Sequence, residues 1–223
     1  MSVKINYIGR MGNNMFQYAF GRLLAEELGL ALENTPDSLR SFAGVIPVSG
    51  KRIETEKKTT IGRPGTRIRD AVKSFRRYPR EVVVNGYFQN ADIYVKHLSR
   101  LRRWFYLSKL PAVENIKDDD VVLCFRRDDY EREGNALSFY YYDTAIRLIQ
   151  PSRVFIVGGR NIDDDVRRYF VKYKPIYYDC GGKDLDDFRF IKLFPNIVQA
   201  NSSFHWWAAF LSHAKTIVSP LPI

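Results

Sequence analysis

The chain has 223 residues, of which 45% are hydrophobic and 14% aromatic, and it carries a formal net charge of +10. A chain of this length and composition can bury a sizeable core, as one large or two small domains, so we expect a soluble globular protein. No run approaches the ~18 apolar residues of a membrane span, and the first residues do not resemble a signal peptide. Two cysteines, Cys124 and Cys180, form neither a disulfide framework nor a metal-binding spacing. These absences predict a cytoplasmic protein.

The N-terminal segment predicts a strand, a glycine-containing loop and a helix in close succession. Residues 5–22 read INYIGRMGNNMFQYAFGR. We expect a strand over residues 3–8 and a helix over 15–29 that carries one apolar stripe. Gly9 and Gly12 permit backbone conformations closed to other residues and let a ligand approach closely. The glycine spacing matches neither the dinucleotide-binding GxGxxG pattern nor a P-loop, so neither of these nucleotide motifs is predicted.

Residues 51–80 are strongly basic. They contain eleven Lys and Arg against three acids, a net charge of +8 and most of the total for the chain. We expect an exposed, partly mobile insertion that ends in a basic helix over residues 66–78. Such a stretch suits nucleic acid, an anionic membrane surface or an acidic glycan, and it also suits a merely solvated face. Because the chain has no zinc-finger, RNA-recognition or helix-turn-helix pattern, we do not expect nucleic acid as a partner.

A strand over 81–85, a helix over 91–103 and a proline-containing linker near 110–115 precede the segment VVLCFRRDDY at residues 121–130. The five apolar residues 121–125 predict a strand buried on both faces of a parallel sheet. Arg126 and Arg127 follow at its carboxyl end, where planar guanidinium groups suit a diphosphate. Asp129 could fix one arginine through a salt bridge. The alternative is a solvated charged turn.

The rest of the chain alternates strands with helices, which predicts an α/β fold with parallel sheets. We divide it into an N-terminal α/β domain, residues 1–110, and a C-terminal Rossmann-like domain, residues 111–223. The expected elements of the second domain after the strand at 121–125 are helix 139–149, strand 153–157, helix 163–171, strand 176–178, helix 184–193, strand 197–200, helix 204–212 and strand 216–218.

Residues 200–211 read ANSSFHWWAAFL and form the most informative stretch. Phe204, Trp207, Ala208 and Leu211 follow a helical spacing, and small polar residues stand directly before them. The free N–H groups of such a helix start bind anions, and a strand-like segment leads into it, as at the ligand edge of open α/β sheets. By itself the pattern more often marks a capped core helix.

Two acidic clusters, residues 118–120 and 163–165, invite a metal interpretation. The first stands before a buried strand, and the second stands where a helix N-terminus favours acids. The arginine pair could neutralise a leaving diphosphate without a metal. We therefore expect no metal site and no cofactor.

Taken together, four segments resemble glycosyltransferase family 11, the α-1,2-fucosyltransferases, and more distantly the α-1,6 and protein O-fucosyltransferases. Residues 9–21 resemble the family's GGLGNQMFQYAFG, and residues 124–130 resemble HxRRGDY. Residues 200–211 resemble ANSSFSWWGAWL, and residues 86–90 resemble GYWQS. The four segments lie in the family's order. Cys124 stands in place of the motif histidine, Asp128 in place of the glycine, and His205 in place of a serine.

The resemblance implies a GT-B-like fold with two Rossmann-like halves, the N-terminal half on the acceptor side and the C-terminal half binding the nucleotide. It implies an inverting transfer of L-fucose from GDP-fucose to a hydroxyl of a glycan acceptor, independent of metal. We expect Arg126, Arg127 and Asp129 to be catalytic. The residues expected to bind the nucleotide sugar are Gly12, Asn13, Asn14, Gln17, Cys124, Asn201, Ser202, Ser203 and Phe204.

Other interpretations stay open. Cys124 and Asp128 would also fit a related transferase that uses another nucleotide sugar. The basic stretch would fit a non-catalytic module that binds glycan or nucleic acid, or a peripheral membrane contact through residues 51–80. No general base is identifiable, and Asp179, Asp184 and Asp187 are candidates for a contact with guanine.

Overall fold

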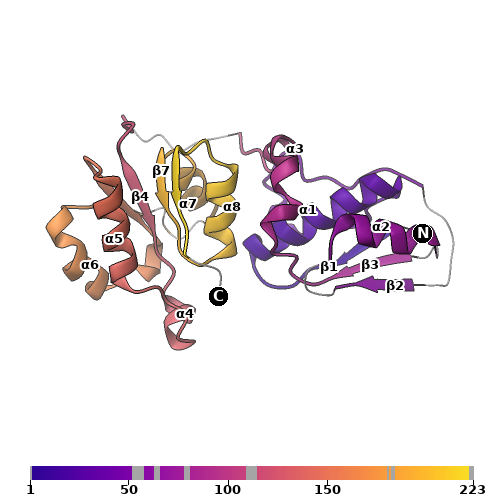
Figure 1. Cartoon of the computed structure of the whole chain (residues 1–223), viewed down its shortest axis with the longest axis horizontal. Coiled ribbons are helices and arrows are strands. Elements are labelled where there is room, and N and C mark those ends of the chain that lie inside the picture. Colours follow the sequence, from indigo (N-terminus) through magenta and orange to yellow (C-terminus); the bar gives the residue numbers. More distant parts are fainter. Residues whose placement is uncertain are drawn as a thin grey trace. The chain divides into compact units, whose positions relative to one another are not determined.

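The computed structural model divides the chain into two compact units, Met1–Ser108 and Lys109–Ile223 (Figure 1). The described residues are 2–51, 58–62, 66–77, 81–108, 115–179, 181 and 184–220. The predicted linker near 110–115 lies almost entirely outside them. Within the described residues, no helix combines the length and apolar character that crossing a bilayer requires.

The N-terminal unit is a three-stranded parallel sheet with helices on one face (Figure 1). Its strand order is β1-β3-β2. Along β1 and β3, Val3, Ile5, Val82 and Val84 are buried, whereas the alternate residues Lys4 and Asn6 are exposed. This alternation is what a sheet covered on one face requires. The elements are β1 (Val3–Asn6), α1 (Met11–Leu28), β2 (Lys58–Ile61), α2 (Ile68–Arg77), β3 (Glu81–Asn85) and α3 (Leu98–Trp104).

Two expectations for this unit were wrong. The basic stretch is not simply an exposed insertion, because Lys58–Ile61 pairs with β3 along its whole length and Ala71 and Val72 of α2 are buried. The helix expected over 91–103 is broken into two 3-10 turns, Ala91–Ile93 and Val95–His97, followed by the shorter α3. The side chain of Asn90 caps the first turn by accepting a hydrogen bond from the backbone N–H of Asp92, at 3.0 Å.

The C-terminal unit is a five-stranded parallel sheet in the order β6-β5-β4-β7-β8. Helices α5 and α6 lie on one side of it, and α7 and α8 on the other (Figure 1). The predicted α/β class with parallel sheets is therefore confirmed. The elements are β4 (Val121–Cys124), α4 (Asp128–Arg132), α5 (Phe139–Ile149), β5 (Val154–Val157), α6 (Asp164–Phe170), β6 (Ile176–Tyr178), α7 (Asp184–Ile191), β7 (Asn196–Val198), α8 (Ser203–Leu211) and β8 (Thr216–Val218).

Both faces of the three central strands, β5, β4 and β7, are buried, which explains the uninterrupted apolar run at 121–125. Val121, Leu123 and Phe125 pack into the cluster formed with α5 and α6. On the other face, Phe155 of β5 meets the ring of Phe194 with centroids 4.9 Å apart. A strand covered on both faces has no position at which a polar side chain would reach water.

A buried carboxylate joins α5 to the turn that follows α6. The side chain of Asp143 is fully buried and accepts a hydrogen bond from Lys172 Nζ at 2.6 Å, as well as from Tyr173 and Arg147. The hydrogen bonds from Lys172 and Tyr173 hold the pKa of Asp143 at about 2, below its ordinary value. A carboxylate with several such donors is stable in its charged form although it is buried.

We expect Asp143→Asn to lower the free energy of unfolding at pH 7 by about 1–3 kcal/mol, because the charged hydrogen bonds are lost. The folded pKa lies below the unfolded one, so this stabilisation is complete above a pH of about 4 and is lost as the pH falls toward 2. Urea unfolding at pH 7 and pH 3 measures both effects. The exposed Asp165→Asn is the matched control, and an equal effect of the two variants would contradict the assignment.

Candidate functional site

The strand order of the C-terminal unit reverses between β4 and β7. The chain proceeds from β4 to β5 on one side and from β7 to β8 on the other, while β4 and β7 pair directly, with Leu123 beside Val198. In open α/β sheets, ligands bind outside the carboxyl ends of the strands at such a point. The loops after β4 and β7 carry two of the segments singled out in the sequence, residues 126–130 and 200–204. The fold therefore brings both to the same sheet edge.

Arg126 is fixed on one side and open on another. Its Nη2 donates to Oδ2 of Asp129 at 2.6 Å, so the predicted ion pair is present. Its Nε is buried and has no hydrogen-bond partner within the described part of the chain. The side chain is 20% exposed. The carboxylate thus sets the direction of the guanidinium and leaves one N–H for a further acceptor.

Arg127 is engaged by carboxylates on both of its donor sides. Its Nε donates to Asp163 at 3.1 Å and its Nη2 to Glu131 at 2.7 Å, and its guanidinium lies 4.7 Å from the ring centroid of Phe139. The side chain is 11% exposed. The two neighbouring arginines therefore differ in their partners: Arg127 ties the β4 loop to the start of α6, and Arg126 keeps one N–H for a further acceptor.

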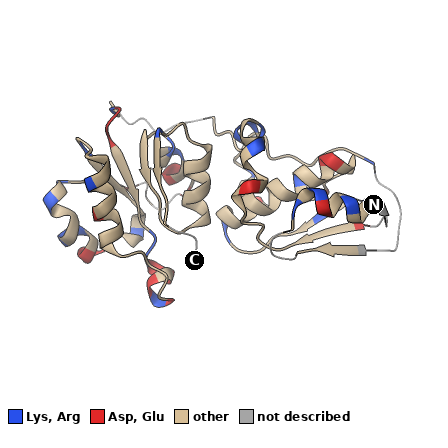
Figure 2. Cartoon of the chain, in the orientation of Figure 1, with Lys and Arg blue, Asp and Glu red and all other residues tan. Residues whose placement is uncertain are grey.

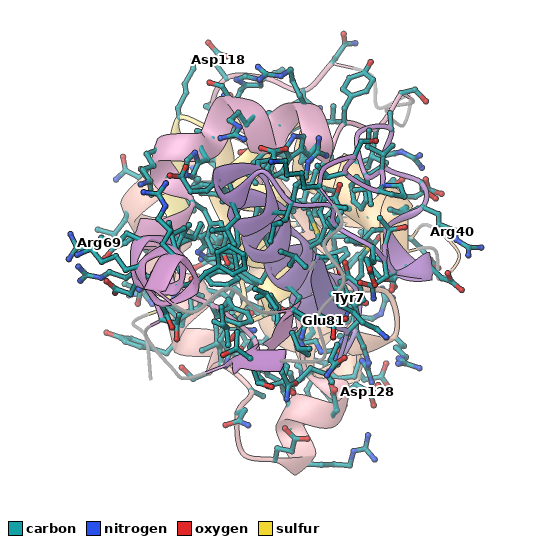
Figure 3. All side chains as sticks on the ribbon, turned by 90° about the vertical axis from the view of Figure 1, so that its right-hand side faces the viewer. Tyr7, Arg40, Arg69, Glu81, Asp118 and Asp128 are labelled. Atoms are coloured by element: carbon teal, nitrogen blue, oxygen red, sulfur yellow. The ribbon has the colours of Figure 1, made fainter. Side chains whose placement is uncertain are left out.

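Asp128 is neutralised by arginines, which explains how an acid is tolerated next to a predicted phosphate site. Its carboxylate pairs with Arg160 at 3.0 Å and with Arg132 at 3.5 Å. Figure 3 labels Asp128 at the start of α4. The backbone N–H groups of Arg127 and Asp128 both donate to Oδ1 of Asn161, at 2.9 and 3.1 Å. Sequence reasoning missed this asparagine, because no motif connects it to the loop that it holds.

Helix α8 begins with the predicted cap. Ser202 is the N-cap residue, and its hydroxyl accepts from the backbone N–H of Phe204 at 3.3 Å. Asn201 donates through Nδ2 to the carbonyl of Asn135 at 2.7 Å, while its Oδ1 is buried and makes no hydrogen bond to any described residue. Ser203 is the first residue of the helix. The first-turn N–H groups of a nine-residue helix present a partial positive charge at this edge.

His205, which the sequence analysis did not select, lies in the first turn of α8. Its side chain is nearly buried, with 6% exposure, and its Nδ1 has no hydrogen-bond partner among the described residues. Burial, together with the charge of Arg126, lowers the pKa of His205 to about 3. The imidazole is therefore neutral at physiological pH. The sequence signal for it was its replacement of a serine in the family motif.

Cys124 lies in the core rather than on the sheet edge. Its side chain is fully buried, and burial followed by the charge of Asp187 raises the pKa of the thiol. Its carbonyl accepts from the hydroxyl of Tyr142 at 2.9 Å. A contact between this thiol and a nucleotide sugar stays a prediction. Asp187, one of the candidates for a guanine contact, lies in the first turn of α7.

In the N-terminal unit, Asn14 and Gln17 form an internal brace. Gln17 accepts from the N–H of Ile8 at 3.2 Å and donates to the carbonyl of Gly86 at 3.0 Å. Asn14 donates to the carbonyl of Ile8 at 3.1 Å, and its Oδ1 accepts from Ser38. Both side chains are buried. They join the loops that follow β1 and β3, next to two of the family-like segments, residues 9–21 and 86–90.

Asn13 and Gln89 stand at the surface of the same two loops. Nε2 of Gln89 donates to Oδ1 of Asn13 at 2.9 Å. Gly9 has a φ of +79°, and a Cβ there would lie 2.2 Å from Nδ2 of Asn13, so the position requires glycine. Gly12 is buried in the first turn of α1. Of the predicted residues in this unit, Asn13 is therefore the one whose polar group lies near the surface.

The acidic clusters have structural partners. Asp163 caps α6 by accepting from the N–H of Val166 at 2.9 Å, and Asp120 forms an ion pair with Arg153. The described residues contain no group of three or more His, Cys, Asp or Glu arranged to hold a metal ion.

No family model matches this chain, so membership of glycosyltransferase family 11 stays a prediction. The O-antigen biosynthesis glycosyltransferase WbnK of Escherichia coli is 29% identical over an alignment of 164 positions, and the match covers 60% of this chain and 53% of that protein. The alignment thus spans about half the length of this curated relative.

Two solved structures have similar folds. A structure of POFUT1 in complex with GDP has a TM-score of 0.53 at 10% identity, and the match covers 97% of each chain. A structure of the α-1,6-fucosyltransferase NodZ soaked with GDP-fucose has a TM-score of 0.50 at 13% identity, covering 95% of this chain and 92% of the other. The fold is therefore α/β with two parallel sheets, and it resembles the GT-B-like folds of fucosyltransferases.

We expect Arg127→Ala to lower the free energy of unfolding by about 1–2 kcal/mol, because it removes two ion pairs and the contact with Phe139. The exposed Arg168→Ala should change it by less than about 0.5 kcal/mol. Thermal unfolding of both variants measures the difference. Unchanged stability of Arg127→Ala, with a loss of nucleotide binding equal to that of Arg126→Ala, would show instead that both arginines serve the ligand.

Proposed function

We propose that the chain is a glycosyltransferase that transfers L-fucose from GDP-fucose to a hydroxyl of a glycan acceptor, with inversion at the transferred carbon. The observation that carries the proposal is the open Nε of Arg126 beside the start of α8 at the strand-order reversal. The similarity to WbnK supports a glycosyltransferase, and the folds of POFUT1 and NodZ support a fucosyl donor.

The chemistry follows from where charge develops. As the bond between the sugar and the β-phosphate breaks, negative charge grows on the departing phosphate oxygen and positive charge grows on the sugar ring. Arg126, held by Asp129, and the N–H groups of the first turn of α8 would stabilise the phosphate charge. Donors that are fixed before the reaction are worth ~10²–10³ in rate each.

In this proposal the leaving group needs no metal, because Arg126 and the helix start supply the positive charge. The amides of Asn13 and Gln89, at the surface of the N-terminal unit, offer both donors and acceptors to the hydroxyl groups of a sugar. Asp129 is assigned to orienting Arg126 and not to accepting a proton, because its Oδ2 accepts from that guanidinium.

We expect Arg126→Ala to weaken GDP binding about 10- to 100-fold, the loss of one charged hydrogen bond. Titration calorimetry with GDP, UDP and CDP measures it. The matched control is Arg132→Ala, which removes an exposed arginine of the same segment that pairs with Asp128.

Each result has a distinct meaning. GDP-selective binding lost in Arg126→Ala but kept in Arg132→Ala supports a GDP-sugar donor. Preference for UDP or CDP would keep the transferase and change the donor. The absence of any nucleotide binding would overturn the proposed enzyme and favour the non-catalytic alternative.

A second role is favoured by the surface of α2. Arg69, Lys73 and Arg76 lie at positions i, i+4 and i+7, are exposed, and form one row along the helix. Asp70, which pairs with Arg69 at 3.6 Å, is the one acid on α2. Figure 2 marks the Lys and Arg positions along α2 in blue, and Figure 3 shows Arg69 pointing outward. Such a row suits peripheral contact with an anionic membrane.

We expect replacement of Arg69, Lys73 and Arg76 by Gln to weaken binding to vesicles with anionic lipid about 100-fold, at ~1 kcal/mol for each cation. The control replaces the exposed Arg132, Arg168 and Lys215, which removes the same charge elsewhere. Vesicle sedimentation at several salt concentrations measures the effect. Equal losses in the two triple variants would contradict a specific role for α2.

A further inference from the structure

Several polar atoms at the strand-order reversal are buried without a hydrogen bond to any residue that the structure describes. Among them are Nε of Arg126, Oδ1 of Asn201 and Nδ1 of His205. Most buried polar groups in folded proteins have a partner, and leaving one unpaired destabilises the fold. These atoms, on the loops after two adjacent strands and in the first turn of α8, indicate a place that a polar ligand completes.

The surroundings of His205 fix its charge state. The ring lies in the first turn of α8, 5.3 Å from the centroid of Phe204, whose own ring meets Phe188 of α7 at 5.5 Å. The positive charge of Arg126 acts on it, and little of its surface reaches water. An imidazole in such a place is neutral, so one of its nitrogens carries a proton and can donate.

We propose that His205 is a positioning residue of the donor site, whose Nδ1–H donates to the phosphate oxygen bound by Nε of Arg126. The inference rests on the proposed function, because it takes a nucleoside diphosphate as the ligand. A phosphate oxygen has several lone pairs and accepts from two donors at once. A neutral donor beside Arg126 adds a hydrogen bond without adding repulsion between two cations.

The isosteric pair His205→Asn and His205→Leu separates hydrogen bonding from packing. An asparagine amide can place its N–H close to the position of Nδ1, while leucine has nearly the same shape and no donor. Calorimetry should show His205→Leu binding GDP about 10- to 100-fold more weakly than wild type, and His205→Asn recovering most of that loss. Guanosine, which lacks phosphate, should bind all three proteins alike.

His213 provides the control, because it is an exposed histidine just after α8. His213→Leu should bind GDP as wild type does. Thermal unfolding of each variant without ligand shows whether it is folded. If His205→Leu does not fold, the ring nitrogens of ¹⁵N-labelled wild-type protein give the answer, because GDP should shift the Nδ1–H resonance of His205 and guanosine should not.

The inference and the proposed function fail in different ways. GDP binding that depends on Arg126 but is equal in His205→Leu and His205→Asn would overturn the role of His205 and leave the function standing. An Nδ1 resonance unchanged by GDP would do the same. Wild-type protein that does not bind GDP would overturn both. Weaker binding of guanosine to His205→Leu would identify His205 as a packing residue and also overturn its proposed role.

Discussion

The pairing of β4 directly with β7 is the constraint on which the candidate site depends. The strand that follows β4 lies on one side of this pair, and the strand that follows β7 lies on the other side. The loops after β4 and β7 therefore leave the same edge of the sheet side by side. Apolar side chains cover both faces of the sheet, so polar side chains can gather only at its edges. Arg126 and the start of α8 meet as a consequence of strand order, although they are far apart in sequence.

Two adjacent arginines of the same loop have different partners, and this difference could not be predicted from the sequence. Arg127 is engaged by Asp163, which lies 36 residues away, whereas Arg126 is held by Asp129, three residues away. The local pair follows from the motif itself, because its two members are neighbours in the chain. The distant pair depends on where α6 begins relative to β4, and that position is a property of the folded sheet.

The difference between local and distant interactions also explains which parts of the fold could be predicted from the sequence. The strand β4 and the helix α8 could be predicted from the spacing of apolar residues alone. A strand buried on both faces is apolar at every position, and a helix buried along one stripe is apolar at every third or fourth position. The strand β2 was missed because its pairing with β3 lies within a stretch dominated by charge. Binding of the nucleotide sugar by Asn14 and Gln17 stays a prediction. Their hydrogen bonds to Ile8 and Gly86 could not be predicted, because a motif gives a residue type without its partner.

The two edges of the C-terminal sheet differ in how their polar groups are satisfied. At the amino edge, Asp120 accepts from Arg153 at 2.9 Å, and its carbonyl accepts from Asn196 at 3.0 Å, which joins the starts of β4, β5 and β7. At the carboxyl edge, Arg126 and His205 keep buried nitrogens that bond to no described residue. Unpaired buried groups destabilise a fold, so they persist where the surrounding structure holds them in place. The paired amino edge and the buried sheet supply that support, which leaves the carboxyl edge free to gain its missing hydrogen bonds from the phosphate of the proposed donor.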